Sequence, residues 1–433
     1  MPADPAPNAD LLPQIEGILM DLVREMTPAR RAGPGRPQIL PEMLLWVGLT
    51  VCVLRGFTSQ LGLWRLLSGK GLWQADRMVI SDEAVYRRLG ASEPSPLAEV
   101  FAQLTTMLTE RVAPWQDQQL APFAQEVVAL DETRLDPVAR SLPALRQHEV
   151  GDAALLPGVI AGVYDLRRQL WRSVQVRTEA FQNEKVAARS LIAELPTGSL
   201  ILADLGYFSF PWFDDLADAG QWWISRIRKQ TSYTIAHICY QDHQTLDALV
   251  WLGKYRADRA KHLVRLVRFQ QGQTTRTYLT NVIDPRVLPI RQIAELYARR
   301  WDIEMAVRTV KRDLGLHLLW SAKPAVIAHQ VWAVLVIAQI VQALRLEIAG
   351  RAGVAPLEVS LPLLIQYLPQ YAAQGVDPIT AFVEDGRRLG FIRPVRRVAI
   401  TAPEVANDQL SLPPPDLPWT RIPRYHSKKA IQP

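Results

Sequence analysis

Three acidic residues stand where a shared carboxylate site could form. Asp131 follows the short apolar run VVAL and Asp204 follows LILA, while Glu304 lies in the helical stretch YARRWDIEMAVRTVK. Each apolar run predicts a buried strand that ends at its aspartate. Neighbouring carboxylates repel each other, so a cation is expected between them, and oxygen-only ligands favour hard ions such as Mg²⁺. Two such ions roughly 3.5–4 Å apart can clamp the attacking and leaving oxygens of a phosphodiester.

The stretch around Glu304 carries a second pattern. Tyr297, Arg300, Glu304 and Lys311 fall at positions i, i+3, i+7 and i+14, which predicts one face of a single helix. Arginine makes bidentate contacts with phosphate and lysine supplies a point charge. This face is therefore suited to hold a metal ion and a phosphate backbone side by side.

Simpler interpretations of the same residues stay open at this point. Aspartate favours turns, so Asp131 and Asp204 could only end their strands. Glu132 and Asp136 are rival acids beside the first strand. Glu304 could be a surface acid paired with Arg300, or with Arg308 at the same helical spacing.

The elements around the acids predict an α/β fold. From residue 127 the patterns run strand, strand, strand, helix, strand, helix, strand, which matches a ribonuclease-H-like mixed sheet with helices on its faces. In such a sheet the first and fourth strands are neighbours, so their ends would bring Asp131 and Asp204 together. Residues 231–283 break the alternation with β-like segments and predict an all-β insertion, after which helical periodicity resumes at Pro289.

Several motifs then resemble one family. The spacing Tyr-x2-Arg-x3-Glu-x6-Lys resembles the signature of the bacterial DDE transposases of the "insertion sequence four" group. ALDETRLD is similar to that family's first-aspartate motif and ADLGYFS to its second, and the long gap from Asp204 to Glu304 fits the family's β insertion. The resemblance covers roughly residues 120–345.

The resemblance implies a cut-and-paste transposase. It implies that two Mg²⁺ or Mn²⁺ ions would be bound by the three acids, Asp131, Asp204 and Glu304. It implies that the phosphates of the transposon end would be held by Tyr297, Arg300 and Lys311. One ion would activate water to nick the end, and the freed 3′-hydroxyl would later join target DNA. The implied partners are double-stranded DNA, as terminal inverted repeats and as target, and a second copy of the chain in a homodimer on DNA.

Two tryptophans receive separate expectations. Trp301 is expected to pack against neighbouring residues. Some relatives stack a flipped base on a tryptophan of the insertion; Trp251 is a candidate for that role, although a tryptophan in the core is the simpler interpretation.

Charge gives weaker signals of DNA contact. The net charge is +6, from 49 Lys and Arg against 43 Asp and Glu, and basic runs lie at 30–36, 387–397 and 421–429. SDEAVYRRLG predicts a short helix capped by Ser81, whose Arg87 and Arg88 could face DNA. A helical bundle with solvated arginines explains these residues equally well.

The predicted setting is cytoplasmic, with the protein on the nucleoid when bound to DNA. Cys52 and Cys239 are too few for a disulfide framework. Polar residues interrupt the apolar stretch 325–344, which favours a buried core helix over a membrane span. No GxxxxGK[ST] motif is present, so an ATP-driven motor is excluded.

Two other functions remain as alternatives. One is a nuclease of the same fold that cuts without strand transfer, and the other is a domesticated transposase that acts as a DNA-binding regulator. The predicted organisation runs from a helical DNA-binding head to a basic tail, with these parts: 1–120 helical head, 121–230 first part of the core, 231–285 β insertion, 286–345 second part of the core with Glu304, 346–411 helical region, and 412–433 Pro-rich tail.

Overall fold

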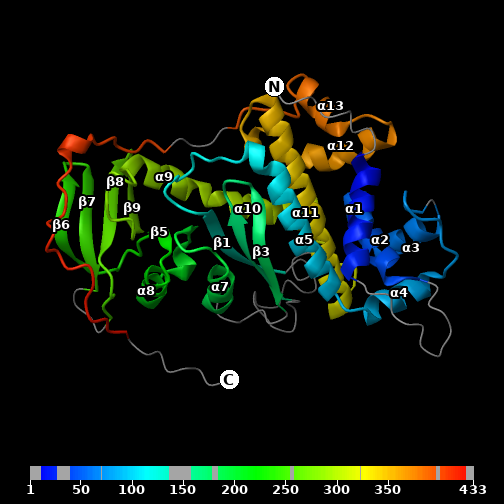
Figure 1. The fold of residues 1–433 in the computed structure, drawn as a ribbon, viewed down its shortest axis with the longest axis horizontal. Helices are drawn as coiled ribbons and strands as arrows, with labels where there is room; N and C mark the ends of the chain where they lie inside the picture. Colours follow the sequence, from blue (N-terminus) through cyan, green and yellow to red (C-terminus); the bar gives the residue numbers. More distant parts are fainter. Residues whose placement is uncertain are drawn as a thin grey trace.

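A computed structural model describes residues 11–26, 40–69, 71–135, 158–177, 184–253, 258–321, 323–395 and 400–425. Helices from the two ends of the sequence gather on one side of the molecule, and a long sheet fills the other side (Figure 1). The first basic run, Asp136, Arg396 and Arg397 lie outside the described residues.

The sheet has nine strands in the order β3-β2-β1-β4-β5-β9-β8-β7-β6. Its first five strands have the predicted ribonuclease-H-like arrangement: β1, β4 and β5 run parallel, while β2 and β3 form an antiparallel hairpin beside β1. These strands are β1 Val127–Arg134, β2 Val159–Asp165, β3 Leu170–Arg177, β4 Leu200–Leu202 and β5 Trp222–Arg226.

The predicted insertion is all-β, and it extends the same sheet. Its strands pair antiparallel in sequence order, and β9 then pairs antiparallel with β5, the last strand of the core. The sequence patterns did not indicate this continuity. The strands are β6 Tyr233–Gln241, β7 Thr245–Leu252, β8 Val264–Gln271 and β9 Thr274–Thr280.

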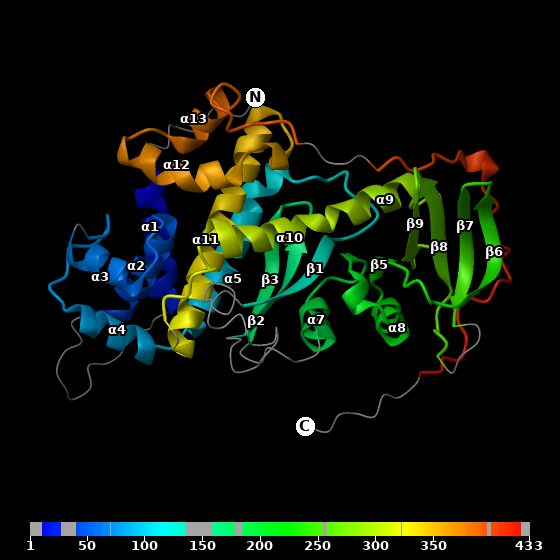
Figure 2. The same ribbon diagram turned by 180° about the vertical axis from the view of Figure 1, so that it is seen from behind.

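Helices cover both faces of the core strands. Val128 and Leu130 of β1 pack in one apolar cluster with α7 (Glu184–Ala193) and α8 (Phe210–Asp218). Val127 and Ala129 pack in the other cluster, which contains residues of α9 (Ile290–Arg299) and α10 (Trp301–Arg308). In Figure 2 these two helices run along the sheet from β9 towards the helical side. Because strand side chains alternate between faces, Asp131 points to the α10 side.

The helical side is organised around α11, which packs against α2 and α5. The helices here are α1 Leu11–Met26, α2 Glu42–Leu54, α3 Gln60–Ser68, α4 Asp82–Ala91, α5 Ser95–Val112, α11 Pro324–Ala352, α12 Leu361–Ala373 and α13 Pro378–Glu384. The Ser81 cap is confirmed, since the Ser81 hydroxyl accepts the N–H of Ala84 at 3.2 Å.

By length and composition α11 could cross a membrane, but most of its apolar stretch is buried inside the protein. Gln339 is one of its buried polar residues, and its side chain is fully hydrogen-bonded. The Gln339 amide accepts from the Trp171 N–H at 2.9 Å and donates to the Trp171 carbonyl at 2.9 Å and the Thr105 hydroxyl at 2.6 Å. The prediction of a buried core helix is confirmed.

The last described segment, residues 400–425, forms a C-terminal strap. It crosses from the C-terminal helices to the strands of the insertion (Figure 1). The Leu263 N–H donates to the Trp419 carbonyl at 2.9 Å, and Arg259 and Arg424 exchange backbone hydrogen bonds. The described part of the Pro-rich tail, residues 412–425, forms no helix and lies against the insertion of its own chain.

Arg421→Ala is expected to loosen the strap. The Arg421 guanidinium donates to the carbonyls of Ala260 at 2.9 Å and Leu252 at 2.5 Å, and it lies 4.9 Å from the ring centre of Trp251. Losing these contacts should destabilise strap docking by about 1–3 kcal/mol. Amide hydrogen exchange at Leu263 should then become about tenfold faster. Arg286→Ala, which removes a surface ion pair, should leave that rate unchanged; equal rates in both variants would contradict the expectation.

Candidate active site

Asp131 in β1 and Asp204 just after β4 lie at the same level of the sheet. The parallel pairing of β1 and β4 runs to Ala129 opposite Leu202, and each aspartate comes two residues after its partner in that pair. Both residues are partly buried, and the alternation of side chains turns both towards α10. The predicted neighbouring strands therefore bring the two aspartates to one place.

The prediction that the first strand ends at Asp131 is wrong. β1 continues to Arg134, because its pairing with β2 persists after its pairing with β4 has stopped. Asp131 therefore lies within a strand, opposite Gly162, and its Oδ1 accepts the N–H of Glu132 at 2.9 Å. Glu132 points to the other face and is ion-paired with Arg177 of β3, so it is separated from the aspartate pair.

Glu304 is supplied by α10, which packs against β1. Its Oε1 accepts a hydrogen bond from the Arg300 guanidinium, as in the simpler interpretation of a helical ion pair. The Arg300 side chain is largely buried, whereas that of Glu304 is about one-third exposed. Glu304 is thus at the edge of the site, where it can meet solvent and ligands.

The electrostatics couple these residues. Burial raises the pKa of Asp131 to about 6; the charges of Asp204 and Glu304 also raise it, against the Glu132 N–H and the Arg300 guanidinium. The pKa of Arg300 is raised, since the hydrogen bond to Glu304 and nearby negative charges, Asp204 included, outweigh its burial. Three acids and one arginine therefore share one electrostatic environment.

Tyr297 lies on the preceding helix, α9. Burial raises its pKa to about 12, and the charges of Arg300, Arg226 and Asp204 all act on its hydroxyl. Its ring packs against that of Tyr278 on β9, with centres 5.3 Å apart. Arg226 of β5 is a neighbour that the sequence reasoning missed, because no local pattern distinguishes it from other strand arginines.

The signature does not lie on one uninterrupted helix. The α9 helix ends at Arg299 and α10 begins at Trp301, with Arg300 as the joint. A π-helical turn, Thr309–Asp313, then carries Lys311, and its wider turn shifts that residue off the predicted stripe. The Lys311 ammonium donates to the Arg134 carbonyl at 2.5 Å, at the end of the strand that contains Asp131.

The donor set suits a hard divalent cation. It offers oxygen ligands only, and the acids raise the pKa of Asp131 by repulsion, which a bound cation would relieve. Within the described residues, no three acidic, histidine or cysteine side chains converge closely enough to hold an ion as they stand. Glu304, which is turned towards Arg300, would have to exchange that contact for the metal.

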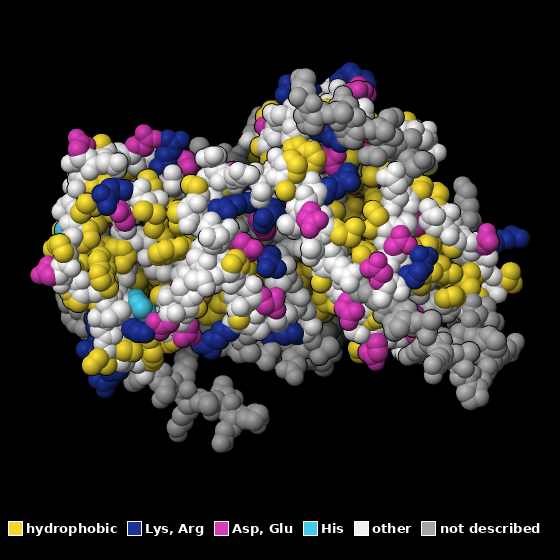
Figure 3. Space-filling view, viewed as in Figure 1, with side chains coloured by type: hydrophobic (Ala, Val, Ile, Leu, Met, Phe, Trp, Pro, Cys, Tyr) yellow, Lys and Arg dark blue, Asp and Glu magenta, His cyan; other side chains and the backbone are white. Residues whose placement is uncertain are grey.

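The tryptophans and arginines outside the signature lie in different surroundings from one another. Trp301 is 58% exposed, so the expectation that it packs is wrong. Trp251 is half-buried under Arg421 of the strap. On α4, Arg87 is exposed, whereas Arg88 pairs with Glu42 of α2 at 2.9 Å. Figure 3 shows basic and acidic side chains mixed along the middle of one face, rather than one continuous basic surface.

Part of the chain that forms this site matches a known protein family. The family described as "Transposase DDE domain" matches residues 146–340, a span that contains Asp204, Glu304 and the Tyr–Arg–Glu–Lys residues and begins after Asp131. Residues 146–340 are thus similar to a transposase DDE domain.

A curated relative agrees with this assignment. Transposase InsG for insertion sequence element IS4, from Escherichia coli (strain K12), is 27% identical over 203 residues. The aligned part makes up 44% of this chain and 45% of that protein, so the chain spans about half the length of its relative. The resemblance to DDE transposases of the IS4 group is confirmed for the DDE domain.

A solved structure shows a looser likeness. The piggyBac transposase synaptic complex with hairpin DNA has a TM-score of 0.40 and 10% identity, covering 92% of this chain and 85% of that one. The ribonuclease-H-like fold of this chain is therefore assigned from the order of its own strands. Members of this family use divalent metal ions, in agreement with the oxygen ligands of the site.

The raised pKa of Asp131 predicts how the metal-free protein responds to pH. Between about pH 4 and 6 the folded protein holds a proton on Asp131 that the unfolded chain has released, so the free energy of unfolding falls as pH rises through this window. Asp131→Asn removes this penalty. In the presence of EDTA the variant should be more stable than the parent by on the order of 2 kcal/mol above pH 7, with the advantage disappearing towards pH 4.

Thermal unfolding at a series of pH values measures this effect. Asp385→Asn, a surface aspartate paired with Arg388, serves as the control and should give a small, pH-independent shift. A stability gain for Asp131→Asn that stays constant from pH 4 to 8 would argue against the assigned environment.

Proposed function

We propose that the chain is a cut-and-paste DNA transposase that nicks transposon ends and transfers the freed 3′-hydroxyl to target DNA. The observation that carries this proposal is the nearness of Asp131 in β1 and Asp204 just after β4 to Glu304 and Arg300, whose charges act on one another. The DDE-domain match adds support from the sequence. As a protein that acts on DNA, it would work in the cytoplasm.

The three carboxylates would hold two Mg²⁺ or Mn²⁺ ions. When bound, such ions activate a nucleophilic oxygen and stabilise the leaving oxygen at a phosphodiester. The protein's own residues then position the DNA. Release of Glu304 from Arg300 would free the Arg300 guanidinium for a bidentate contact with a phosphate.

The remaining residues of the signature, Tyr297 and Lys311, would add further contacts with DNA phosphates. The Tyr297 hydroxyl would stay protonated at neutral pH, because its pKa is about 12, and could donate to a phosphate oxygen. Lys311 would supply a point charge near the end of β1. The proposed partners are double-stranded DNA, with terminal inverted repeats and target as its two forms, and a second copy of the chain bound to the paired ends. Arg87 would contact DNA away from the centre.

An assay with DNA separates this function from the alternatives. The substrate is a linear duplex that carries the inverted repeats flanking the gene, incubated with Mg²⁺ or Mn²⁺ and a supercoiled target plasmid. We expect nicking at the repeat ends and joined products on the plasmid. Metal-dependent cutting without joined products would indicate a nuclease. DNA binding without metal-dependent cutting would indicate a regulator. Either outcome would overturn the proposal.

A further inference from the structure

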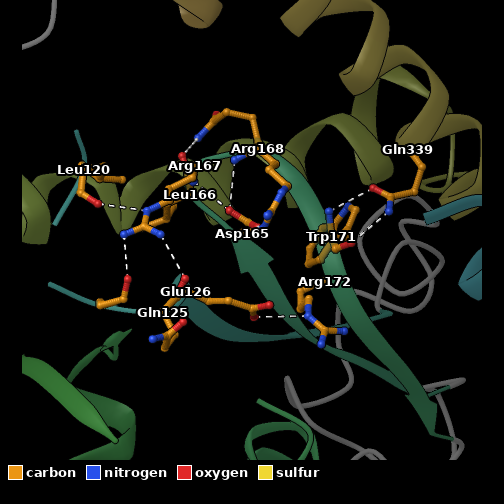
Figure 4. Close-up of polar contacts among 12 residues, drawn as sticks. Leu120, Gln125, Glu126, Asp165, Leu166, Arg167, Arg168, Trp171, Arg172 and Gln339 are labelled. Atoms are coloured by element: carbon orange, nitrogen blue, oxygen red, sulfur yellow. Dashed lines mark hydrogen bonds and ion pairs between the residues drawn. The ribbon is translucent and has the colours of Figure 1, made fainter. Parts of the chain in front are cut away.

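The turn between β2 and β3 is held rigidly on one side of the site. The Asp165 carboxylate accepts the N–H groups of Arg167 and Arg168 at 2.8 and 3.0 Å and pairs with the Arg168 guanidinium at 2.6 Å (Figure 4). The Arg167 guanidinium donates to four backbone carbonyls of the segment before β1, those of Leu120, Ala121, Ala124 and Gln125. These hydrogen bonds therefore fix the conformation of the turn and its position against the segment before β1.

Gln169 closes the turn in a conformation that side chains rarely adopt, with φ of +55°. The residue is buried, and its carbonyl accepts the Tyr164 hydroxyl at 2.6 Å. Its Nε2 donates to the Leu166 carbonyl and to Oδ2 of Asp302, each at 3.0 Å. Backbone strain of this kind persists only where the surroundings enforce it.

Asp302 lies on α10, between Arg300 and Glu304. It is 2% exposed, and the Arg299 Nε also donates to its Oδ2, at 2.7 Å. Another nitrogen of the Arg299 guanidinium donates to the Leu166 carbonyl at 3.0 Å. Gln169, Arg299, Asp302 and the Leu166 carbonyl together form what we call the hairpin latch.

The hairpin latch holds the residues on both sides of Arg300, and its contacts lie on the helix face opposite the site. Arg299 and Asp302 flank Arg300 in sequence, where α9 gives way to α10. At about 100° per residue, Asp302 lies about 200° around the helix from both Arg300 and Glu304. The latch therefore fixes the backbone that carries Arg300 and Glu304 and leaves the opposite face of the helix, with these two side chains, free of latch contacts.

We propose that Asp302 is a positioning residue for the DNA-cleavage site: through the hairpin latch it sets the orientation of Arg300 and Glu304 towards Asp131 and Asp204. This inference rests on the proposed function. Groups that orient metal ligands from behind affect metal affinity or activity by about 10–100-fold when removed. Because Asp302 is buried, it would act on the DNA only through Arg300 and Glu304.

The test compares Asp302→Ala, Asp302→Asn and Gln169→Asn with the parent protein at full length. Asp302→Asn keeps the shape and one acceptor oxygen. Gln169→Asn suits the positive φ and so keeps the turn folded, but its amide is one methylene too short to reach Asp302. Asp385→Asn is the matched control, an aspartate in a surface ion pair.

Three measurements are made on each variant below its melting temperature. They are binding of Mn²⁺ to the protein without DNA, followed by electron paramagnetic resonance; amide hydrogen exchange over 299–308; and the Mn²⁺ concentration for half-maximal cleavage. We expect Asp302→Ala and Gln169→Asn to weaken Mn²⁺ binding by about tenfold or more, to raise the half-maximal concentration similarly and to speed exchange in α10. Asp302→Asn should recover most of this loss.

The outcomes distinguish the two proposals. If the parent cleaves but Gln169→Asn and Asp302→Ala bind Mn²⁺ and exchange as the parent does, the positioning role is overturned. If Asp302→Ala does not fold, Gln169→Asn decides the question in the same way. If the parent shows no metal-dependent cleavage, the proposed function fails, whereas Mn²⁺ binding and exchange still report on the latch.

Discussion

Glu304→Gln is expected to reduce metal-dependent cleavage of an end-bearing duplex by about 10³-fold or more, because a ligand charge worth several kcal/mol in the transition state is lost. Glutamine has the size of glutamate and can still accept the hydrogen bond from Arg300, so α10 should remain folded. Single-turnover cleavage with Mg²⁺ measures the rate, and a binding assay with the same duplex should give an affinity within about threefold of the parent.

Glu295→Gln provides the control for this prediction. Glu295 lies on α9, is largely exposed and pairs with Arg291 at 2.8 Å, so its loss should leave cleavage unchanged. If Glu304→Gln cleaved as fast as Glu295→Gln, the three-acid site would be wrong. If both lost cleavage together, the effect would come from the helix fold rather than from the carboxylate.

Asp247→Ala is expected to be the most destabilising single change in the insertion. Asp247 of β7 and Arg265 of β8 are fully buried and form a bidentate pair, with both N···O distances 2.7 Å. The same guanidinium donates to the Leu288 carbonyl at 2.6 Å, just before α9 begins. Removing the carboxylate leaves a buried cation unpaired, which costs about 3–5 kcal/mol.

Urea unfolding, followed by hydrogen exchange in β7 and β8, measures this loss. The double variant Asp247→Leu/Arg265→Met should recover most of the stability, since an apolar pair of similar volume needs no compensating charge. Asp284→Asn, in a surface pair with Arg286, should cost less than about 1 kcal/mol. A small loss in Asp247→Ala, comparable to that of Asp284→Asn, would show that the buried pair contributes little.

Local sequence patterns predicted the structure correctly where a residue's role depends on its near neighbours in sequence. Short apolar runs predicted the core strands, because a strand buried on both faces is apolar throughout, and β-like segments predicted the insertion. Ser81 predicted its own helix start, since a cap bonds to a backbone N–H three residues away. The apolar runs before Asp131 and Asp204 likewise predicted that the two aspartates lie at neighbouring strands.

Local patterns did not predict the features of the fold that depend on a segment distant in sequence. The extension of β1 to Arg134 depends on β2, and the joint at Arg300 separates two helices that periodicity alone joins into one. Trp301 looked like a packing residue because tryptophan is large and apolar, yet no described element covers more than part of it. The strap lies against strands from which more than a hundred residues separate it in sequence.

The sequence by itself thus determined the acids, the signature residues and the order of strands and helices, because each is written in residue types and short spacings. Only the tertiary structure decided that the insertion continues the core sheet, that Glu304 rests on Arg300, and that Asp302 is tied to Gln169, its partner 133 residues away. Contacts of that range form when buried polar groups must find partners in the folded chain, and no local periodicity records which partner they find.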